Sequence, residues 1–210
     1  MTSSNRVSRS ARREAILEAA RSHFVVNGYH GTGMDDVAAT LGLSKPILYQ
    51  YFASKHELYL AVLEMAAAHL ENLITRTLSK DLSNKDMVRA TVETFFGFVS
   101  DDSQYYRLLF DSDMLDDADA AERVENVIEG LVEKVANLIS ADTGMSRSHS
   151  IMLANLVIGA SEFSAKAWLS QQRTNAEEVA IEDAAALTWQ TVWRGLRSIP
   201  AQENIPAQEN

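Results

Sequence analysis

Residues 45–51, KPILYQY, carry more aromatic and hydrogen-bonding side chains than one and a half turns of helix can bury. If Leu48 and Phe52 face a core, some of the others must point outward, where an aromatic side chain needs a partner. The base edges of a DNA major groove offer one, because Gln50 can bind a base edge and Lys45 can donate to guanine or to a phosphate. The residue types in this stretch therefore favour DNA recognition.

Neighbouring side chains have complementary expected roles. Pro46 and Ile47 can contact a thymine methyl group. Four further residues are expected to bind phosphate oxygens and so to fix the register of the protein on the duplex: Thr32, Tyr49, Tyr51 and Lys55.

The spacing around this stretch predicts two short helices joined by a tight turn. Gly42 supplies the left-handed residue that ends the first helix, and Ser44 caps the second, with Pro46 just inside it. The second helix, roughly Lys45 to Tyr51, is too short to be stable alone. The first helix has an apolar face at helical spacing, formed by Met34, Val37, Ala38 and Leu41. A helix-turn-helix that inserts its second helix into the major groove accounts for this pattern.

The flanking sequence indicates how the motif is positioned. Ser10 is expected to cap a preceding helix that Gly28 ends, and Ser54 to cap a long helix from Lys55 to about Ser79. We therefore expect a DNA-binding domain at residues 1–54, with a disordered basic arm at its start. Residues 55–200 would form an effector-binding and dimerisation domain, and residues 201–210, which repeat IPAQEN, a disordered tail.

The net charge of −10 is unevenly distributed. Residues 1–59 hold seven Lys and Arg against five Asp and Glu, a net charge of +2, so the remainder carries −12. Only the N-terminal part therefore has a field suited to phosphate. The acidic remainder helps to keep DNA away from the rest of the protein.

The remaining chain predicts an all-α fold, because helical apolar patterns recur, no strand pattern is convincing, and Gly and Pro are few. We expect a three-helix DNA-binding domain joined to a six-helix domain. Beyond the helix that starts at Lys55, helices are expected at 84–99 with Asn84 as cap, after Ser103, and at 120–140, 146–172 and 177–198. The acidic segment between Asp111 and Asp119 is expected to be a solvated linker.

The last two helices favour a homodimer. Residues 146–172 are apolar nearly all round, so both sides should be covered. Residues 177–198 have a broad apolar face made of Ile181, Ala185, Trp189, Val192, Trp193, Leu196 and, just beyond, Ile199. Two such helices per subunit predict a two-fold four-helix bundle, and this symmetry matches a palindromic operator.

Several other functions find no support in the sequence. There is no Cys, so disulfides, thiol catalysis and cysteine zinc sites are excluded. The five His show no metal-ligand spacing, and the acidic segment lacks the Gly and distal Glu of a calcium loop. No nucleophile elbow, phosphate loop or HExxH is present. We expect no metal, cofactor or enzyme, and, without a signal peptide or long uncharged apolar run, a cytoplasmic protein with no membrane partner.

Residues 28–58, GYHGTGMDDVAATLGLSKPILYQYFASKHEL, resemble the signature of TetR-type transcriptional regulators, and the likeness covers Ala15 to Leu58. The resemblance implies a dimeric regulator that joins through its last two helices. Many relatives have Thr or Ser where this chain has Gly33, a position that caps the first motif helix and sometimes contacts phosphate. Gly33 is therefore included among the expected DNA-contacting residues.

The sensor part holds more aromatic and apolar side chains than helix packing requires, and a mostly apolar cavity between helices is a recurrent solution for binding an effector. The expected effector-binding residues are Leu70, Leu78, Phe95, Phe98, Tyr106, Arg107, Phe110 and Trp168. Most of these can equally be ordinary core residues.

Three segments, KPILYQYFASKHELYLAVL, TFFGFVSDDSQYYRLLFDSDM and LISADTGM, resemble the actinobacterial FasR-type regulators of fatty-acid synthesis. The resemblance implies a long-chain acyl-CoA in a tunnel, with Leu70, Leu78 and Phe95 at tunnel-lining positions. Leu73, where a Gly would widen the channel, and Tyr105 beside Tyr106 depart from the pattern. The expected function is a repressor of lipid biosynthesis genes that acyl-CoA releases from DNA, although the family that the chain resembles contains both repressors and activators and the residues do not distinguish them. One alternative is a repressor of an efflux or catabolic operon that responds to a drug or another apolar effector, and the alternative from a different class is a helical-bundle enzyme.

Overall fold

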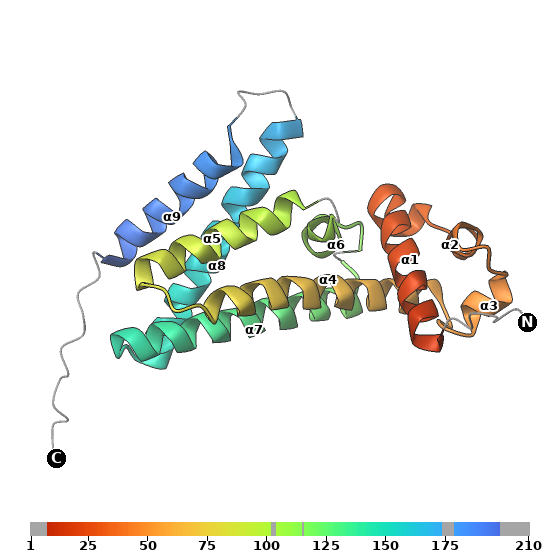
Figure 1. Ribbon diagram of the computed structural model, residues 1–210, viewed down its shortest axis with the longest axis horizontal. Coiled ribbons are helices and arrows are strands. Elements are labelled where there is room, and N and C mark those ends of the chain that lie inside the picture. The colour runs from red at the N-terminus through yellow and green to blue at the C-terminus, as the bar shows by residue number, and fades with distance from the viewer. Residues whose placement is uncertain (1–7, 102–103, 115, 174–178, 198–210) are drawn as a thin grey trace, which may run out of the picture. The chain divides into compact units, whose positions relative to one another are not determined.

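The computed structural model describes residues 8–101, 104–114, 116–173 and 179–197 (Figure 1). Within these ranges the chain forms helices and no strand, which confirms the all-α prediction. The helices are α1 (Arg9–Gly31), α2 (Met34–Thr40), α3 (Lys45–Tyr49), α4 (Lys55–Leu78), α5 (Asn84–Ser100), α6 (Tyr105–Phe110), α7 (Ala118–Thr143), α8 (Arg147–Arg173) and α9 (Ile181–Arg197). Most of the predicted basic arm and the whole predicted tail lie outside the described residues.

By packing, the chain divides into two compact units. The N-terminal unit consists of Met1–His69 with Ser103–Glu125, and the bundle unit of Leu70–Asp102 with Asn126–Asn210. Helices α4 and α7 therefore each contribute residues to both units. The predicted functional boundary after residue 54 stays a prediction.

Two helices start with a different cap from the one predicted. The Ser8 hydroxyl accepts a hydrogen bond from the Ala11 amide (3.1 Å) and begins α1, while Ser10 lies inside the helix. The Ser83 hydroxyl likewise accepts from the Asp86 amide (3.2 Å) and begins α5. In both cases the predicted residue lies one or two positions inside the helix, because neighbouring polar residues are equally able to cap.

The helix-turn-helix forms as predicted, with small differences at its ends. Gly42 has a φ of 62° and makes the left-handed turn. Ser44 occupies the N-cap position of α3, but its side chain accepts no capping hydrogen bond, and the helix ends at Tyr49 instead of Tyr51. Gly28, at φ 70°, breaks α1 as expected, although the chain resumes a helical path over the next three residues.

Aromatic side chains form the centre of the N-terminal unit. The ring of Tyr59 on α4 lies edge-on to Phe24, at 5.2 Å between centroids, and to Tyr29, at 5.3 Å. The Tyr59 hydroxyl is 2.7 Å from the Ser112 hydroxyl, so the segment after α6 is tied to the same core. This core fixes the first turns of α4 against the end of α1.

The bundle unit is built around α5, α8 and α9, which pack against one another. Its core is apolar and includes the fully buried side chains of Val92, Phe96, Phe98, Leu131 and Ala154. None of the described helices is long and apolar enough to cross a membrane.

Candidate nucleic-acid interface and ligand cavity

Helix α3 presents most of the predicted DNA-contacting side chains to solvent. Lys45, Pro46 and Gln50 are exposed, and Tyr49 is 41% exposed although it is aromatic. Ile47 and Tyr51 are half-buried, and Leu48 and Phe52 are buried, as the pattern predicted. One face of the short helix thus anchors it, and the other is available to a partner.

Lys45 is held by a carboxylate from the preceding helix. Its Nζ lies 2.8 Å from Asp35 Oδ2, and both side chains are exposed. This hydrogen bond raises the pKa of Lys45 above its ordinary value. The ion pair directs the cation of α3 alongside the first turn of α2, where it can exchange Asp35 for a phosphate or a base.

The start of α2 explains the glycine at position 33. The Gly33 amide donates to Asp36 Oδ2 at 2.9 Å, so Asp36 caps the helix in place of a residue-33 side chain. A Cβ at position 33 would lie 2.8 Å from the same oxygen. Thr or Ser at this position would therefore require the Asp36 side chain to move.

The side chains of Thr32 and Lys55 bind backbone carbonyls beside the motif. Thr32 is 2% exposed, and its hydroxyl donates to the Gly28 carbonyl at 2.8 Å. Lys55 Nζ donates to the carbonyls of Tyr29 (2.9 Å) and Thr32 (3.0 Å). These contacts tie the α1–α2 connection to the first turn of α4. The phosphate contact expected of each residue stays a prediction, and for Thr32 it would require the hydroxyl to leave Gly28.

Asp113 supports the same connection, a role that the sequence did not reveal. Its carboxylate accepts from the Tyr29 amide (2.9 Å) and the His30 amide (3.2 Å), which follow the break at Gly28. Burial opposes the charged form, but these two backbone donors outweigh it and lower the pKa of Asp113. The prediction of a solvated linker is therefore wrong at Asp113, because its carboxylate caps the amides that follow Gly28.

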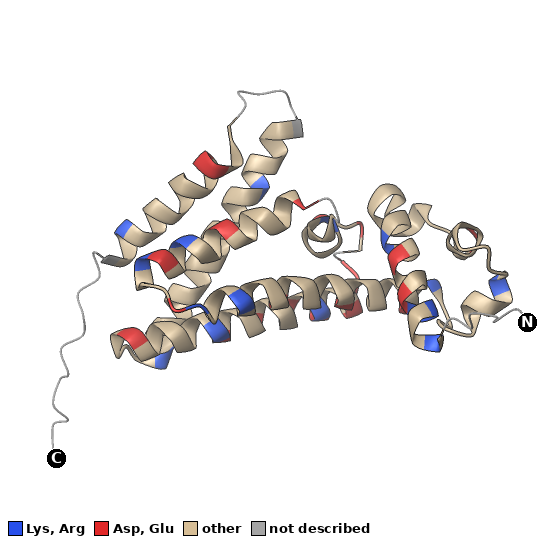
Figure 2. Cartoon of the chain, in the orientation of Figure 1, with Lys and Arg blue, Asp and Glu red and all other residues tan. Residues whose placement is uncertain are grey.

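Two arginines of α1 lie beside aromatic residues at the end of the motif. The Arg9 guanidinium is 5.9 Å from the centroid of the Tyr51 ring, and that of Arg13 is 5.1 Å from the centroid of Phe52. Figure 2 shows basic residues on α1, among acidic ones, and at the start of α3. These cations add to the field near α3 that favours phosphate.

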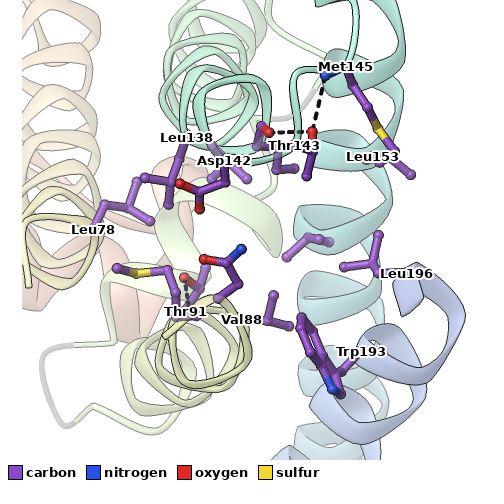
Figure 3. A pocket seen from close by; sticks show the side chains of 15 residues that line it. Leu78, Val88, Thr91, Leu138, Asp142, Thr143, Met145, Leu153, Trp193 and Leu196 are labelled. Atoms are coloured by element: carbon purple, nitrogen blue, oxygen red, sulfur yellow. Dashed lines mark hydrogen bonds between the residues drawn. The ribbon is translucent and has the colours of Figure 1, made fainter. Parts of the chain in front are cut away.

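The bundle unit contains an apolar cavity of about 200 Å³. In Figure 3, Leu78, Leu138 and Asp142 lie together on one side and Trp193 and Leu196 on the other. The full lining is Leu78, Asn84, Met87, Val88, Thr91, Val135, Leu138, Ile139, Asp142, Thr143, Met145, Leu153, Val157, Trp193 and Leu196. The Thr91 and Thr143 hydroxyls donate to carbonyls one turn earlier in their own helices, which leaves Asn84 and Asp142 as the polar groups available to a ligand.

The predicted effector residues do not gather in one place. Leu78 lines this cavity, and Phe95 lines a space of about 10 Å³ that shares Thr91 and Val135 with it. Leu70 and Phe98 are buried in the core of the bundle unit. Trp168 lies in a groove between α8 and α9, where its indole donates to the Val179 carbonyl at 2.8 Å.

Tyr106, Arg107 and Phe110 lie on α6 in the N-terminal unit. There Arg107 lines a separate cavity of about 170 Å³ together with Gly28 and Asp113. A role for these three residues in effector binding stays a prediction.

The outer face of α8 and α9 is unusually apolar. Met152, Leu156 and Phe163 on α8 are 69%, 53% and 72% exposed, and Leu187 on α9 is 72% exposed. Beside them runs the groove of about 480 Å³ that contains Trp168, with small side chains such as Ala160, Ser164 and Ala184 in its walls.

The face of the last helix that was expected to join two subunits packs within one chain instead. Trp193 and Leu196 line the cavity, and Ala185 and Val192 are buried. Ile199 lies outside the described residues. The helical pattern identified an apolar face but not the surface that covers it.

One cluster of metal-binding side chain types was also missed. His56, Asp117 and Asp119 each place a ligand atom within 4.8 Å of the others, although His56 and Asp117 are 61 positions apart. Spacing within a helix could not reveal this group, because only the fold brings it together.

Two family models match the chain, and together they span most of it. The model of the bacterial regulatory proteins of the tetR family matches residues 16–62, and that of the tetracyclin repressor-like C-terminal domain matches residues 84–194. The first match contains α2 and α3, and the second contains α5, α6, α7 and α8.

Similar proteins agree with the family models. The chain is 39% identical over 196 residues to the HTH-type transcriptional activator FasR of Mycolicibacterium smegmatis, which covers 93% of this chain and 88% of that protein. A TetR-like transcriptional regulator from Rhodococcus sp. RHA1 superimposes with a TM-score of 0.71 at 28% identity, over 92% of this chain and 100% of that one. The regulator FadR from Bacillus subtilis, solved in complex with stearoyl-CoA, gives 0.69 at 11% identity over 85% and 96%, a likeness of fold.

These relatives are transcriptional regulators, which confirms both the predicted resemblance and the prediction that the chain is not an enzyme. The chain belongs to the TetR family of bacterial transcriptional regulators.

Proposed function

We propose that this regulator binds a palindromic operator as a homodimer and that a long-chain acyl-CoA, bound in the bundle unit, releases the DNA. The expected targets are genes of fatty-acid and lipid biosynthesis. The sequence led us to expect repression, whereas the M. smegmatis relative is named an activator. The position of the operator relative to the promoter decides between the two, and footprinting measures it. Both proposed ligands belong to the cytoplasm.

Operator binding is supported by the exposed side of α3. Two copies related by a two-fold axis would lie one helical turn of DNA apart, roughly 34–36 Å. Gln50 and Lys45 are exposed at the surface of α3, where Gln50 can approach a base edge and Lys45 can do so by exchanging its partner Asp35. Tyr49 and Tyr51 flank them and are proposed to bind phosphate.

Dimerisation is supported by the exposed apolar residues of α8 and α9. Met152, Leu156 and Phe163 repeat at spacings of four and seven residues, so they form one stripe along α8. The groove lined by small residues lies beside this stripe, and a bulky side chain from a second copy could fill it. A self-complementary combination of stripe and groove is what a two-fold interface requires.

The apolar cavity, in which Asn84 and Asp142 are the polar side chains that do not donate within their own helix, carries the effector proposal. Its volume of about 200 Å³ is below the roughly 300–1,000 Å³ usual for ligand pockets, so a long acyl chain must enlarge it. The cavity can extend into the adjoining small space by moving few side chains, because Thr91 and Val135 form walls of both spaces. Ile74 and Leu78 of α4 line these two spaces, so enlarging them would displace α4.

Helix α4 is the proposed link between ligand and DNA. It carries Leu78 at one end and, at the other, Lys55, which binds the backbone of the DNA-binding motif. If the cavity and the operator favour different positions of α4, each ligand weakens binding of the other by the same factor.

Asp142 favours a thioester over a free fatty acid. Among the described residues that line the cavity, none is Lys or Arg, so a carboxylate ligand would meet Asp142 without a compensating cation. In an acyl-CoA the uncharged thioester replaces that carboxylate, the amides of the pantetheine arm could bind Asn84 or Asp142, and the charged phosphates lie farther along the molecule.

The same carboxylate favours one alternative. A compact apolar cation, of the kind that efflux regulators bind, would fit a cavity of this size with Asp142 as its partner and Trp193 as an aromatic wall. The two candidate ligands therefore differ in charge and in length.

The test is operator binding by fluorescence anisotropy, titrated with acyl-CoAs of eight to eighteen carbons. Because each buried methylene contributes about 0.8 kcal/mol, the concentration needed for release should fall steeply with chain length until the cavity is full. Free fatty acids should act weakly on the native protein and about tenfold more strongly on Asp142→Asn. If the release of operator DNA does not depend on acyl-chain length but is caused by apolar cations, the result would instead support the efflux alternative.

A further inference from the structure

His56, Asp117 and Asp119 form a compact cluster within the N-terminal unit. His56 Nε2 lies 3.1 Å from Asp117 Oδ1, 3.3 Å from Asp117 Oδ2 and 3.9 Å from Asp119 Oδ2. His56 is the second residue of α4, and the two aspartates lie at the start of α7. Each side chain is at least 30% exposed, so solvent and ions can reach all three.

The cluster carries uncompensated negative charge. The only cationic side chain that the described part of the chain brings within 4 Å of either carboxylate is His56 itself. The nearby Arg123 pairs with Glu64 and donates to the Asp119 carbonyl, not to its carboxylate. Two carboxylates against one imidazole leave a net charge of −1 even when His56 is protonated.

We propose that His56, Asp117 and Asp119 bind a divalent first-row metal ion such as Zn²⁺ or Mn²⁺, with water completing the coordination. Metal–ligand bonds of about 2.0–2.2 Å place neighbouring ligand atoms roughly 2.9–3.5 Å apart. The 3.1 Å separation already satisfies this geometry, and the 3.9 Å separation requires only a small movement of the exposed Asp119 side chain.

One imidazole with two carboxylates indicates the metal class. Imidazole suits Zn²⁺ and related transition metals, and carboxylates suit Mn²⁺ as well as Zn²⁺. Mg²⁺ and Ca²⁺ prefer oxygen ligands throughout, so they should bind more weakly.

A purely structural explanation makes a different prediction for Asp119. Asp117 caps α7 by accepting from the Ala120 amide at 3.0 Å, and His56 can stabilise that cap. In this explanation Asp119 only places negative charge in the first turn of a helix, where it is mildly favourable. If the cluster binds metal, Asp119 is needed as much as His56.

The consequence of binding would be local. A metal ion would join the first turn of α4, where Lys55 binds the Tyr29 and Thr32 carbonyls, to the first turn of α7. It should therefore stabilise the N-terminal unit by mass action, in proportion to its concentration above Kd.

The experiment is titration of the full-length chain with Zn²⁺, Mn²⁺ and Mg²⁺ by calorimetry, with melting temperature as a second readout. Wild type and the control Asp116→Asn, an exposed neighbour outside the cluster, should bind one equivalent of Zn²⁺ or Mn²⁺ and melt at a higher temperature with it. His56→Gln and Asp119→Asn should each weaken binding about tenfold or more. Binding should also weaken in acid, because the ligands must be deprotonated.

Asp119→Asn is the decisive variant, because it leaves the Asp117 cap intact and its metal-free melting temperature shows whether it folds. No uptake of Zn²⁺ or Mn²⁺ by wild type would overturn the proposal. So would unchanged uptake in both variants, which would assign the metal to other surface histidines.

Discussion

The DNA-binding motif and the bundle cavity hold their functional side chains by opposite means. Around α2 and α3, directional polar contacts fix the backbone: Lys55 binds two carbonyls, Asp113 caps two amides, and Asp36 caps α2. Around the cavity, apolar side chains from five helices meet with few such contacts and leave space.

The difference follows from what each region must do. A helix of five residues, such as α3, has no stability of its own, so polar anchors must hold it in position before DNA arrives. A sensor needs two packings of similar energy, and apolar contacts that lack direction allow this. Changes in the motif should therefore damage structure, whereas changes in the cavity should alter the response and leave the fold intact.

The largest effect is expected from a substitution that disrupts the proposed two-fold dimer, on which the DNA-binding motif and the bundle unit both depend. Phe163→Asp places a charge in the proposed apolar interface, where burial without a partner is strongly unfavourable. Sedimentation should show a monomer, and operator affinity should fall about a hundredfold or more because each half-site must then be bound separately. The exposed Asn137→Asp on α7 adds the same charge elsewhere and should remain dimeric. A dimeric Phe163→Asp would place the interface on another surface.

Lys55→Met tests whether polar anchors hold the motif. The substitution keeps the length of the side chain but removes charge-assisted hydrogen bonds to the Tyr29 and Thr32 carbonyls, each worth roughly 1.5–3 kcal/mol. Thermal unfolding should show a loss of about 2 kcal/mol after solvent replaces part of these bonds, together with weaker operator binding. If operator binding falls while stability is unchanged, Lys55 acts on phosphate, as the sequence first suggested.

Val88→Phe makes the opposite test in the cavity. The added ring atoms should occupy space that an acyl chain needs, with little overpacking because Val88 is only half-buried. We expect operator binding to remain normal and the acyl-CoA concentration needed for release to rise about tenfold, close to the loss of two methylenes. The conservative Val88→Ile should change it less. Loss of operator binding by Val88→Phe would mean that the cavity and the motif are not separable.

The parts that the sequence predicted well are those governed by local signals. Gly42 at its turn, the inward Leu48 and the exposed Tyr49 all follow from residues within one or two helical turns. Ser10 was predicted to cap α1, whereas Ser8 does so, because either serine could accept a hydrogen bond from an amide of the first turn.

The parts that could not be predicted depend on contacts between distant positions. Asp113 is 84 residues from Tyr29, and nothing in an acidic segment distinguishes a cap from a solvated charge. Similarly, the apolar face of α9 was visible in the sequence, but Trp193 faces the cavity of its own chain because α5, α7 and α8 supply the other walls. Periodicity shows that a face is covered and does not show by what.

The smallest expected effect concerns the ion pair between Asp35 and Lys45, a side chain of α3 that is proposed to contact DNA. Asp35 holds Lys45 at 2.8 Å, so in the proposed complex DNA must displace a carboxylate before it gains the cation. Because both groups are exposed, water screens the ion pair and its displacement is easy. Asp35→Asn should therefore raise operator affinity a few-fold and raise affinity for unrelated DNA by at least as much, since it also removes a charge that repels phosphate. Anisotropy titrations with operator DNA and with unrelated DNA, over a range of salt concentrations, measure these affinities. Asp36→Asn is unsuitable as a control because it removes the α2 cap. Equal or weaker affinity for both duplexes would show instead that Asp35 positions Lys45 for binding, which would extend to α3 the rule that polar anchors hold this motif.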